Sequence, residues 1–542
     1  MGFPTKVQLI NRKASEQWYI NFPSALAQAM DFTRGETVEW SVEDKEPACP
    51  PPSQSASLRF KKNSVGILPS IQKLWRECAP SFSQQRVAER AEALSLSSLL
   101  CLGRHTVTGL LTTCGLEFED WSADYRLFSE HRLPTIEIYS VIRRGVLHQL
   151  PPQAPFCAAI DDSLLRKTGI RIPGVAWRRD PLGPHFHTNF VRAQRVLQLS
   201  ADLPLPAGNH RMVPIAFLHA PTPVKPAANA SPDQRIQYKK DSRQARLPLL
   251  AAQQIASLRQ SLNTEPDGAT RPLHIFVDGG YTNSTVLKSL PANTTLVGRI
   301  RKDAKLYFLP EPSQAPRKPG RPLHYGADAP TPEQVRTDES IPWQKLPITI
   351  NGFSHEMRVK VLANLQWRTA GLQHTLQLVV VAPLGYRLRK GSKLLYRKPA
   401  YLICTDPRLD RLALLQGFVQ RWDIEVNFRE EKTLLGVGEA QVRNPESVQE
   451  LPAFQVASYA MLLLSMNRSP DSNANSLPPP KWASQAPPRQ STQNAINQLR
   501  GEVWGQALGL TNFSDLLIST PSITSPEKLL PHLPSAILYA TN

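Results

Sequence analysis

Two continuous apolar runs, one in the first half of the chain and one just past its midpoint, end at aspartates. Residues 156–163 read FCAAIDDS and residues 273–281 read LHIFVDGGY, so the first run meets Asp161 and Asp162 and the second meets Asp278. Short runs that are apolar on both faces are typical of strands in a sheet that helices cover on both sides. The pattern therefore predicts an α/β core whose strands carry carboxylates at their ends.

A third carboxylate follows in the last third of the chain, on a helix predicted over residues 410–435. At about 100° per residue, four side chains of this helix fall within a wedge of roughly 60°: Phe418, Arg421, Glu425 and Lys432. One helix face would then carry an aromatic ring, a guanidinium, a carboxylate and an ammonium. A carboxylate between two fixed cations suits a metal ion and a phosphodiester, although the same spacing of Arg421 and Glu425 also fits an ordinary helix salt bridge.

The pattern also divides the chain into segments. Apolar residues recur at helical spacing between residues 65 and 150 and permit a helix-turn-helix, which would contact DNA through Arg104, His105 and Thr108. A helical stretch at 241–262 would cover the sheet, and stretches rich in Pro and Ser are typical of linkers. We predict a β-rich module at 1–47, a helical DNA-binding region at 58–150, a catalytic core at 151–295 and 401–467, a β-rich insertion at 296–400, a linker at 468–492 and a C-terminal helical tail at 493–542.

Composition adds an expectation about the partner and the compartment. Lys plus Arg number 63 against 45 Asp plus Glu, which gives a formal net charge of +18. Such an excess favours a polyanionic partner, with nucleic acid ahead of membrane. The six cysteines form no CxxC pair, so they indicate neither a zinc site nor a disulfide framework and are expected to be reduced, mostly buried thiols. Because no signal peptide is evident and the longest apolar run, at 453–466, is too short and too mixed to span a bilayer, we expect a cytoplasmic protein with no membrane partner.

Three carboxylates on rigid elements are a suitable ligand set for divalent cations. A phosphodiester is attacked in line, and two such ions about 4 Å apart can stabilise both the attacking and the leaving oxygen. Mg²⁺ prefers hard oxygen ligands, and Mn²⁺ could replace it. The candidates are Asp161 or Asp162, Asp278 and Glu425. Carboxylates gathered in one place repel one another and acquire raised pKa values without a metal.

The order Asp, Asp, Glu, together with the F-xx-R-xxx-E-xxxxxx-K column, resembles the DDE transposases of bacterial insertion sequences. It looks like the group with a Y-R-E-K motif around its catalytic glutamate. Further matching text is DWSADYRLF at 120–128, WRRDPLGP at 177–184, DGGYTN at 278–283, GRIRKDAKLY at 298–307 and RWDIEVNFREEKTLLG at 421–436. The resemblance spans roughly residues 65–467. It implies a ribonuclease H-like core with a β-rich insertion between the second aspartate and the glutamate.

The resemblance also implies roles for single residues. Asp161, Asp278 and Glu425 would be the metal ligands, and the family's D-x-[ST] pattern favours Asp161 over Asp162. Two side chains of the column, Arg421 and Lys432, would hold DNA phosphates, although Lys432 could instead pair with a nearby glutamate. Phe418 stands where the family has a tyrosine, so it keeps the ring and loses the hydroxyl donor.

The implied activity is cleavage of double-stranded DNA at the ends of a mobile element, followed by joining to target DNA. Water would first free a 3′-OH, which would then attack the partner strand or the target. A homodimer that holds two DNA ends and an association with the nucleoid are implied in the same way.

Basic residues elsewhere are further candidates for DNA contact. The first 47 residues resemble a swapped-hairpin AbrB-type DNA-binding module, in which Arg12, Lys13 and Arg34 would contact DNA; the alternative is a small β-rich appendage with no such role. Three more cations, in a strand-like stretch, would line a channel for the element's end: Arg299, Arg301 and Lys302. The alternative for these three is a solvated face.

Three other functions stay open at this stage. The first is a catalytically inactive, domesticated transposase that only binds DNA. The second is a nuclease that recognises DNA structure rather than a particular end. The third is a transcriptional regulator that acts through the N-terminal module.

Overall fold

The structure is a computed structural model that describes residues 66–180, 183, 189–205, 208–310, 324–350, 352–387, 391–468 and 489–507, and the backbone of residues 7–12 and 15–20. In the predicted N-terminal module, strands β1 (Val7–Arg12) and β2 (Ser15–Ile20) pair antiparallel, as the strand pattern predicts. The rest of that module, with Lys13 and Arg34, lies outside the described residues. So do residues 469–488 of the predicted linker and residues 508–542 of the predicted tail.

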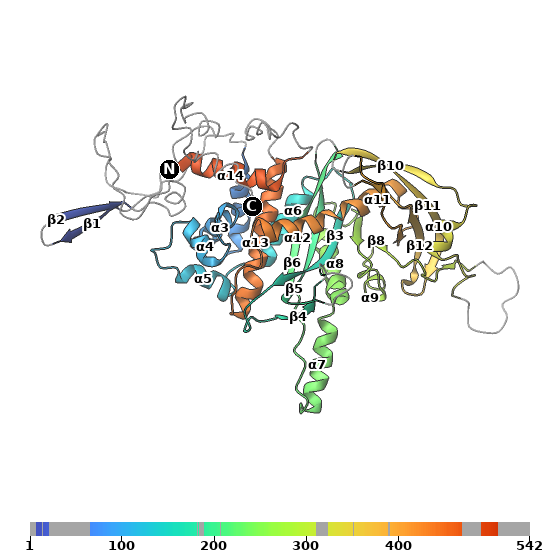
Figure 1. The fold of residues 1–542 in the computed structure, drawn as a ribbon, viewed down its shortest axis with the longest axis horizontal. Coiled ribbons are helices and arrows are strands. Elements are labelled where there is room, and N and C mark those ends of the chain that lie inside the picture. The colour runs from blue at the N-terminus through green and yellow to red at the C-terminus, as the bar shows by residue number, and fades with distance from the viewer. Residues whose placement is uncertain are drawn as a thin grey trace, which may run out of the picture.

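A mixed sheet of eleven strands forms the centre of the molecule (Figure 1). Its first half consists of β3 (Phe156–Arg166), β4 (Ala176–Arg179), β5 (Phe190–Pro204), β6 (His210–His219), β7 (Leu273–Val277) and β8 (Thr294–Arg299). β3, β7 and β8 are parallel neighbours, whereas β5 runs antiparallel to β3 and pairs with β6 on its far side. The two runs that the sequence marks as apolar are thus adjacent central strands, and their buried side chains explain the absence of polar alternation.

The β-rich region that follows extends the same sheet. It contributes β9 (Tyr307–Phe308), β10 (Gln344–Ile350), β11 (Phe353–Trp367), β12 (Gly371–Val381) and β15 (Ala400–Cys404), besides a small separate pair, β13 (Gly385–Tyr386) and β14 (Leu395–Tyr396). β15 pairs antiparallel with β8 and so joins the insertion to the core. The predicted boundary at 295/296 falls inside β8, because that strand is a buried core strand rather than the first strand of the insertion.

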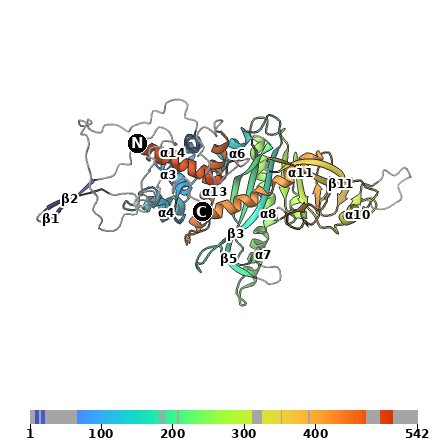
Figure 2. The same ribbon diagram turned by 45° about the horizontal axis from the view of Figure 1, so that its top comes forward.

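Helices lie on both faces of the central strands (Figures 1 and 2). α11 (Arg411–Gln420) and α12 (Asp423–Thr433) pack on one face, where Ala159 of β3 and Met212 of β6 meet Ile424 and Phe428 of α12. The other helices of this half are α7 (Pro232–Gln244), α8 (Leu247–Asn263), α9 (Ser284–Leu287) and α10 (Pro332–Thr337). α8 packs against β5 and α9 and shares the larger apolar cluster with β3 and β7.

The N-terminal helices gather around a long apolar helix from the other end of the chain. They are α2 (Ile67–Cys78), the 3₁₀ turn η1 (Ala79–Ser81), α3 (Gln85–Leu100), α4 (Val107–Thr113), α5 (Ser122–Ser129) and α6 (Thr135–Leu147). α13 (Pro445–Arg468) packs against α2, α3, α5 and α6 and also against β6. α14 (Thr492–Ala507) closes the group against α2 and α3. Because α13 is apolar almost all round, it must be covered on every side, and this joins the helical region to the sheet.

Two smaller expectations concern the cysteines and the membrane. The five described cysteines are free thiols, and Cys78, Cys101 and Cys404 are buried, as predicted. Among the described helices, none is both long and apolar enough to cross a bilayer.

Candidate active site

Strand pairing brings the first two aspartates side by side. β3 and β7 are parallel, and Ile160 pairs with Val277. Asp161 directly follows Ile160, and Asp278 directly follows Val277. The two aspartates therefore come one residue after the last pair of two neighbouring strands, and neighbouring strands are about 4.8 Å apart. The chain leaves the sheet after Asp278 through Gly279 and Gly280. The two aspartates therefore lie level with each other, just past the last paired position of two central parallel strands.

β3 does not end at its aspartates, which differs from the prediction of a strand that stops there. It continues to Arg166 because β5 keeps pairing with it: Asp161 pairs with Gln198, and Arg166 pairs with Ala193. Only its partner β7 ends at this level. The polar residues after Ile160 are thus strand residues at a sheet margin, half-buried rather than in a loop.

The two consecutive aspartates face opposite sides of the sheet. Asp161 lies on the side of α12, where it meets Arg421. Asp162 accepts a hydrogen bond of 2.6 Å from the Tyr281 hydroxyl on the other side, and its charge acts on Arg178 and Arg195. Strand alternation makes this division obligatory. Of the two aspartates, Asp161 is the one that faces the side of the helix that carries Glu425.

Glu425 lies in the first turn of α12, just after a break in the helix that the sequence predicts. The single helix expected over 410–435 is two helices, α11 and α12, separated at Arg421 and Trp422. Amide groups at the break bond three residues back: Ile424 N–H donates to Arg421 O and Glu425 N–H donates to Trp422 O. Such 3₁₀-type bonds tighten a helix end and turn the side chains that follow.

Arg421 links two of the three carboxylates. Its Nη1 lies 3.6 Å from Asp161 Oδ2, and its Nη2 donates a 3.2 Å hydrogen bond to Glu425 Oε1. The Arg421 side chain is 7% exposed, and its Nε and Nη1 have no hydrogen-bond partner among the described residues. A guanidinium whose N–H groups lack partners can donate hydrogen bonds to one more anionic group.

The carboxylates raise one another's proton affinity. The pKa of Asp161 is raised to about 7, first by burial and then by the charges of Asp162 and Glu425, which outweigh the lowering effects of the Asp162 amide and Arg421. The pKa of Glu425 is also raised, first by burial and then by the charge of Asp278, while Arg421 lowers it. Glu425 thus acts electrostatically on one aspartate and is acted on by the other. This mutual repulsion is what a divalent cation relieves.

The donor chemistry fits a hard divalent cation, although the side chains are not gathered into a ligand set. Within the described ranges, no group of three or more His, Cys, Asp or Glu side chains lies close enough to hold a metal ion. Carboxylate oxygens are the ligands that Mg²⁺ prefers. Arg421 occupies the position between Asp161 and Glu425 and supplies the positive charge there.

The remaining residues of the predicted column lie along the same face. Phe418 of α11 is half-buried beside the second apolar cluster, and the Arg421 guanidinium carbon lies 5.8 Å from its ring centre. Lys432 Nζ donates a 2.6 Å hydrogen bond to Ser163 Oγ of β3 and feels the charge of Glu431. Two members of the column, Arg421 and Lys432, thus contact β3 although the helix is interrupted.

Of the three predicted insertion cations, Arg299 comes closest to the carboxylates. Val277 pairs with Gly298 across β7 and β8, so Arg299 follows at the same level as Asp278. Arg301 is 86% exposed and forms an ion pair with Asp303. Lys302 is exposed in the turn after β8. Arg104 and Thr108 lie at the start of α4, whereas His105 is buried, which removes it as a DNA contact.

The sequence did not predict the polar side chains that form hydrogen bonds on the face of α12 opposite Glu425. Asn427 donates to Met212 O and to the Tyr459 hydroxyl, and it accepts from Ser200 Oγ. The Tyr459 hydroxyl in turn donates to Glu430 Oε2 at 2.6 Å. The only local signal was a set of polar residues on the helix face opposite Glu425, a pattern that a solvent-facing helix also shows.

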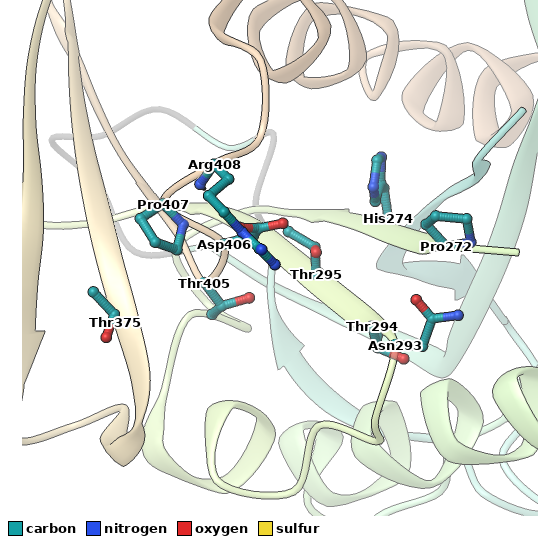
Figure 3. Close-up of a pocket in the computed structure, with 10 residues that line it drawn as sticks. All are labelled: Pro272, His274, Asn293, Thr294, Thr295, Thr375, Thr405, Asp406, Pro407 and Arg408. Atoms are coloured by element: carbon teal, nitrogen blue, oxygen red, sulfur yellow. The ribbon is translucent and has the colours of Figure 1, made fainter. Parts of the chain in front are cut away.

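Figure 3 shows a cavity of about 560 Å³ near the amino ends of β7 and β8. Its lining includes His274, Thr294, Thr375, Thr405, Asp406 and Arg408. Because Asp278 follows the opposite end of β7, the cavity and the three carboxylates lie at opposite ends of these strands.

Comparison with known proteins identifies the family. The central strand order β6-β5-β3-β7-β8, with β3, β7 and β8 parallel, is consistent with a ribonuclease H-like fold. Residues 77–373 match the family model of the DDE superfamily endonuclease, a span that includes Asp161 and Asp278 and ends before Glu425. No curated protein matches the chain. Since the match covers more than half of the residues, the chain belongs to the DDE superfamily endonuclease family and is an enzyme of the nuclease type.

Proposed function

We propose that the protein is a DNA transposase that cleaves and joins strands at the ends of a mobile element. The observation that carries this proposal is the level position of Asp161 and Asp278, just past the last paired residues of β3 and β7, with Glu425 joined to Asp161 through Arg421. Family membership supports an endonuclease activity on DNA.

In this proposal, Asp161, Asp278 and Glu425 would hold Mg²⁺ or Mn²⁺. The bound metal would supply the positive charge that activates the attacking oxygen and stabilises the leaving oxygen. The choice of Asp161 over Asp162 is supported by the Asp162 side chain, which faces the other side of the sheet and accepts a hydrogen bond from Tyr281.

The cations on the helix face would position the DNA. Arg421 would place its positive charge beside the scissile phosphate while it keeps Asp161 and Glu425 oriented. Lys432, held at Ser163, would contact a phosphate farther along β3. Arg299, beside Asp278, would contact the strand from the other side.

Water would attack first and release a 3′-OH, and that hydroxyl would attack the partner strand or the target at the same site. A homodimer on two DNA ends and association with the nucleoid belong to the same proposal.

The decisive test is cleavage of supercoiled plasmid by the full chain with Mg²⁺ or Mn²⁺, compared with Glu425→Gln. Removing a ligand that stabilises the transition state by several kcal/mol should slow nicking by about a hundredfold or more. Glu339→Gln is the matched control, since Glu339 is exposed in the turn after α10. Binding of duplex DNA should persist in both variants.

The other outcomes separate the rival functions. If wild type and Glu425→Gln bind DNA alike and neither nicks it, the protein is a DNA-binding module that has lost catalysis. If wild type cleaves branched DNA of unrelated sequence and ignores the repeats that flank its own gene, it is a structure-specific nuclease. Loss of nicking in the Glu339→Gln control would show that the assay reports folding rather than catalysis.

A further inference from the structure

One helix of the core domain, α7, contributes no buried residue to the core. α7 projects away from the sheet in both views (Figures 1 and 2), and none of its thirteen residues is buried. It is nevertheless a well-formed helix: Pro232 occupies the first turn, and Ser231 and Gln234 form a reciprocal capping box. A helix that is polar on every side gains no stability from a core. Because the core does not explain this exposed helix, its surface is a candidate for binding a partner.

The base of α7 is fixed to the edge of the catalytic sheet. Arg195 of β5 donates a 2.8 Å hydrogen bond to Ala245 O, directly after the helix, and another to Ala220 O, where the chain leaves β6. Arg195 pairs with Leu164 of β3, three residues beyond Asp161. At 1.5 Å per residue, the helix extends about 20 Å from this base. It therefore projects from the end of the sheet that carries the aspartates.

The exposed surface of α7 carries a basic face, which we define as Arg235, Lys239, Lys240 and Arg243. Arg235, Lys239 and Arg243 recur every four residues and line one side of the helix, with Lys240 beside them. All four side chains are exposed, and none of them forms an ion pair with a carboxylate in the part of the chain that the structure describes. The helix holds only two acidic residues, Asp233 and Asp241. The face is thus an unneutralised row of cations.

The ends of strands β4 and β5 next to α7 carry further cations and exposed aromatic rings. Trp177 of β4 is 68% exposed and Phe190 of β5 is 60% exposed. The guanidinium carbon of Arg192 lies 5.9 Å from the Trp177 ring centre. Arg178 donates to Thr222 Oγ1, which ties β4 to the segment that leads into α7. Cations and exposed rings at one end of the sheet are what a nucleic-acid surface presents.

We propose that the basic face of α7 contacts the sugar-phosphate backbone of duplex DNA that runs past the catalytic end of the sheet. This inference rests on the proposed function and assigns a second contact, outside the scissile phosphate. Successive cations four residues apart are separated by about 6 Å along the helix, and each strand of DNA presents a phosphate for every 3.4 Å of rise, roughly. Charge is complementary, and the contact would be independent of sequence because it reaches no base.

The test measures the binding of duplex DNA to the full chain in which Arg235, Lys239, Lys240 and Arg243 are all changed to Gln. Glutamine keeps helix propensity, and none of these side chains packs on the core. A fluorescent duplex of random sequence is titrated at several salt concentrations, in EDTA, so that no cleavage occurs. A plot of log K against log salt concentration has a negative slope, and each lost phosphate contact makes that slope less steep by about 0.9. We expect the slope of the variant to be less steep by about three to four, and its affinity to fall at least about tenfold at moderate salt.

A charge-matched control removes four exposed cations elsewhere: Lys73, Arg86, Lys288 and Lys398. The inference is overturned if this control lowers the slope as much as the α7 variant, or if the α7 variant binds like the parent. It is also overturned if the α7 variant loses binding to anionic lipid vesicles and keeps binding to DNA. A parent protein that binds DNA through α7 and never cleaves it would refute the proposed function and leave this inference standing.

Discussion

Glu431 is a carboxyl group in the interior of the protein, on the back of the helix that carries Glu425. It is 1% exposed, and its Oε1 has no hydrogen-bond partner among the described residues. Its pKa is raised to about 8, first by burial and also by the charge of Glu430, which together outweigh a hydrogen bond from Gln198 and the charge of Lys432. We predict that Glu431 is largely protonated in the native protein at neutral pH, so that Glu431→Gln stabilises the fold.

The sign and the size follow from the difference between the two states. Since the native pKa lies above that of the unfolded chain, ionisation favours unfolding. The contribution of Glu431 to stability is therefore complete below about pH 4.5 and is lost progressively as the pH rises to 8. Each pH unit in that window costs about 1.4 kcal/mol, so the loss reaches roughly 3 kcal/mol at pH 7. Glutamine resembles the protonated acid in shape and does not ionise, so it should recover most of this amount.

The assay is thermal unfolding of the parent and Glu431→Gln at a series of pH values from 5 to 8, with Glu339→Gln as an exposed control. The Tm of the Glu431→Gln variant should exceed that of the parent by a few degrees at pH 8, and the difference should shrink towards pH 5. A variant that is less stable than the parent at every pH, or a Tm difference independent of pH, would show that Glu431 is ionised in the native state and would refute the reasoning.

Three further predictions concern single contacts. Tyr281→Phe removes the hydroxyl that donates a hydrogen bond to Asp162. Because such a bond to a charged group contributes about 1.5–3 kcal/mol, plasmid nicking should slow by about tenfold while the circular dichroism spectrum stays unchanged. An unaltered nicking rate would mean that the loop after Asp278 does not need this support. Gly417→Ala should destabilise the fold by about 1–3 kcal/mol, seen as a lower Tm, since its new Cβ would lie 2.1 Å from the ring of the buried Phe276; a Tm equal to that of the parent would show that α11 can move away from β7. Burial raises the pKa of Cys404 to about 12, so iodoacetamide should modify this thiol only after denaturation, as peptide mass spectrometry would show; labelling of the native protein at the rate of a free thiol would contradict the packing.

Local sequence determined the elements that bear the chemistry. The apolar runs before Asp161 and Asp278 predicted two buried strands, and the spacing of Arg421 and Glu425 predicted their contact, although Arg421 lies at the break between α11 and α12. These features depend on neighbours a few residues away, because burial on both faces and helical periodicity are written in consecutive positions. The text matches to a known family added the expectation that the segments belong together, which the match over 77–373 supports.

Only the tertiary structure decided which groups meet. The pairing of Ile160 with Val277 sets the two aspartates level, and the pleat of β3 sends Asp161 and Asp162 to opposite faces. The chain around each residue carries no record of its partner strand, because register is chosen by contacts more than a hundred residues apart. For the same reason the burial of Glu431 and the exposure of α7 could not be read from their own polar sequences, since the surroundings that bury one and leave the other in solvent come from distant parts of the chain.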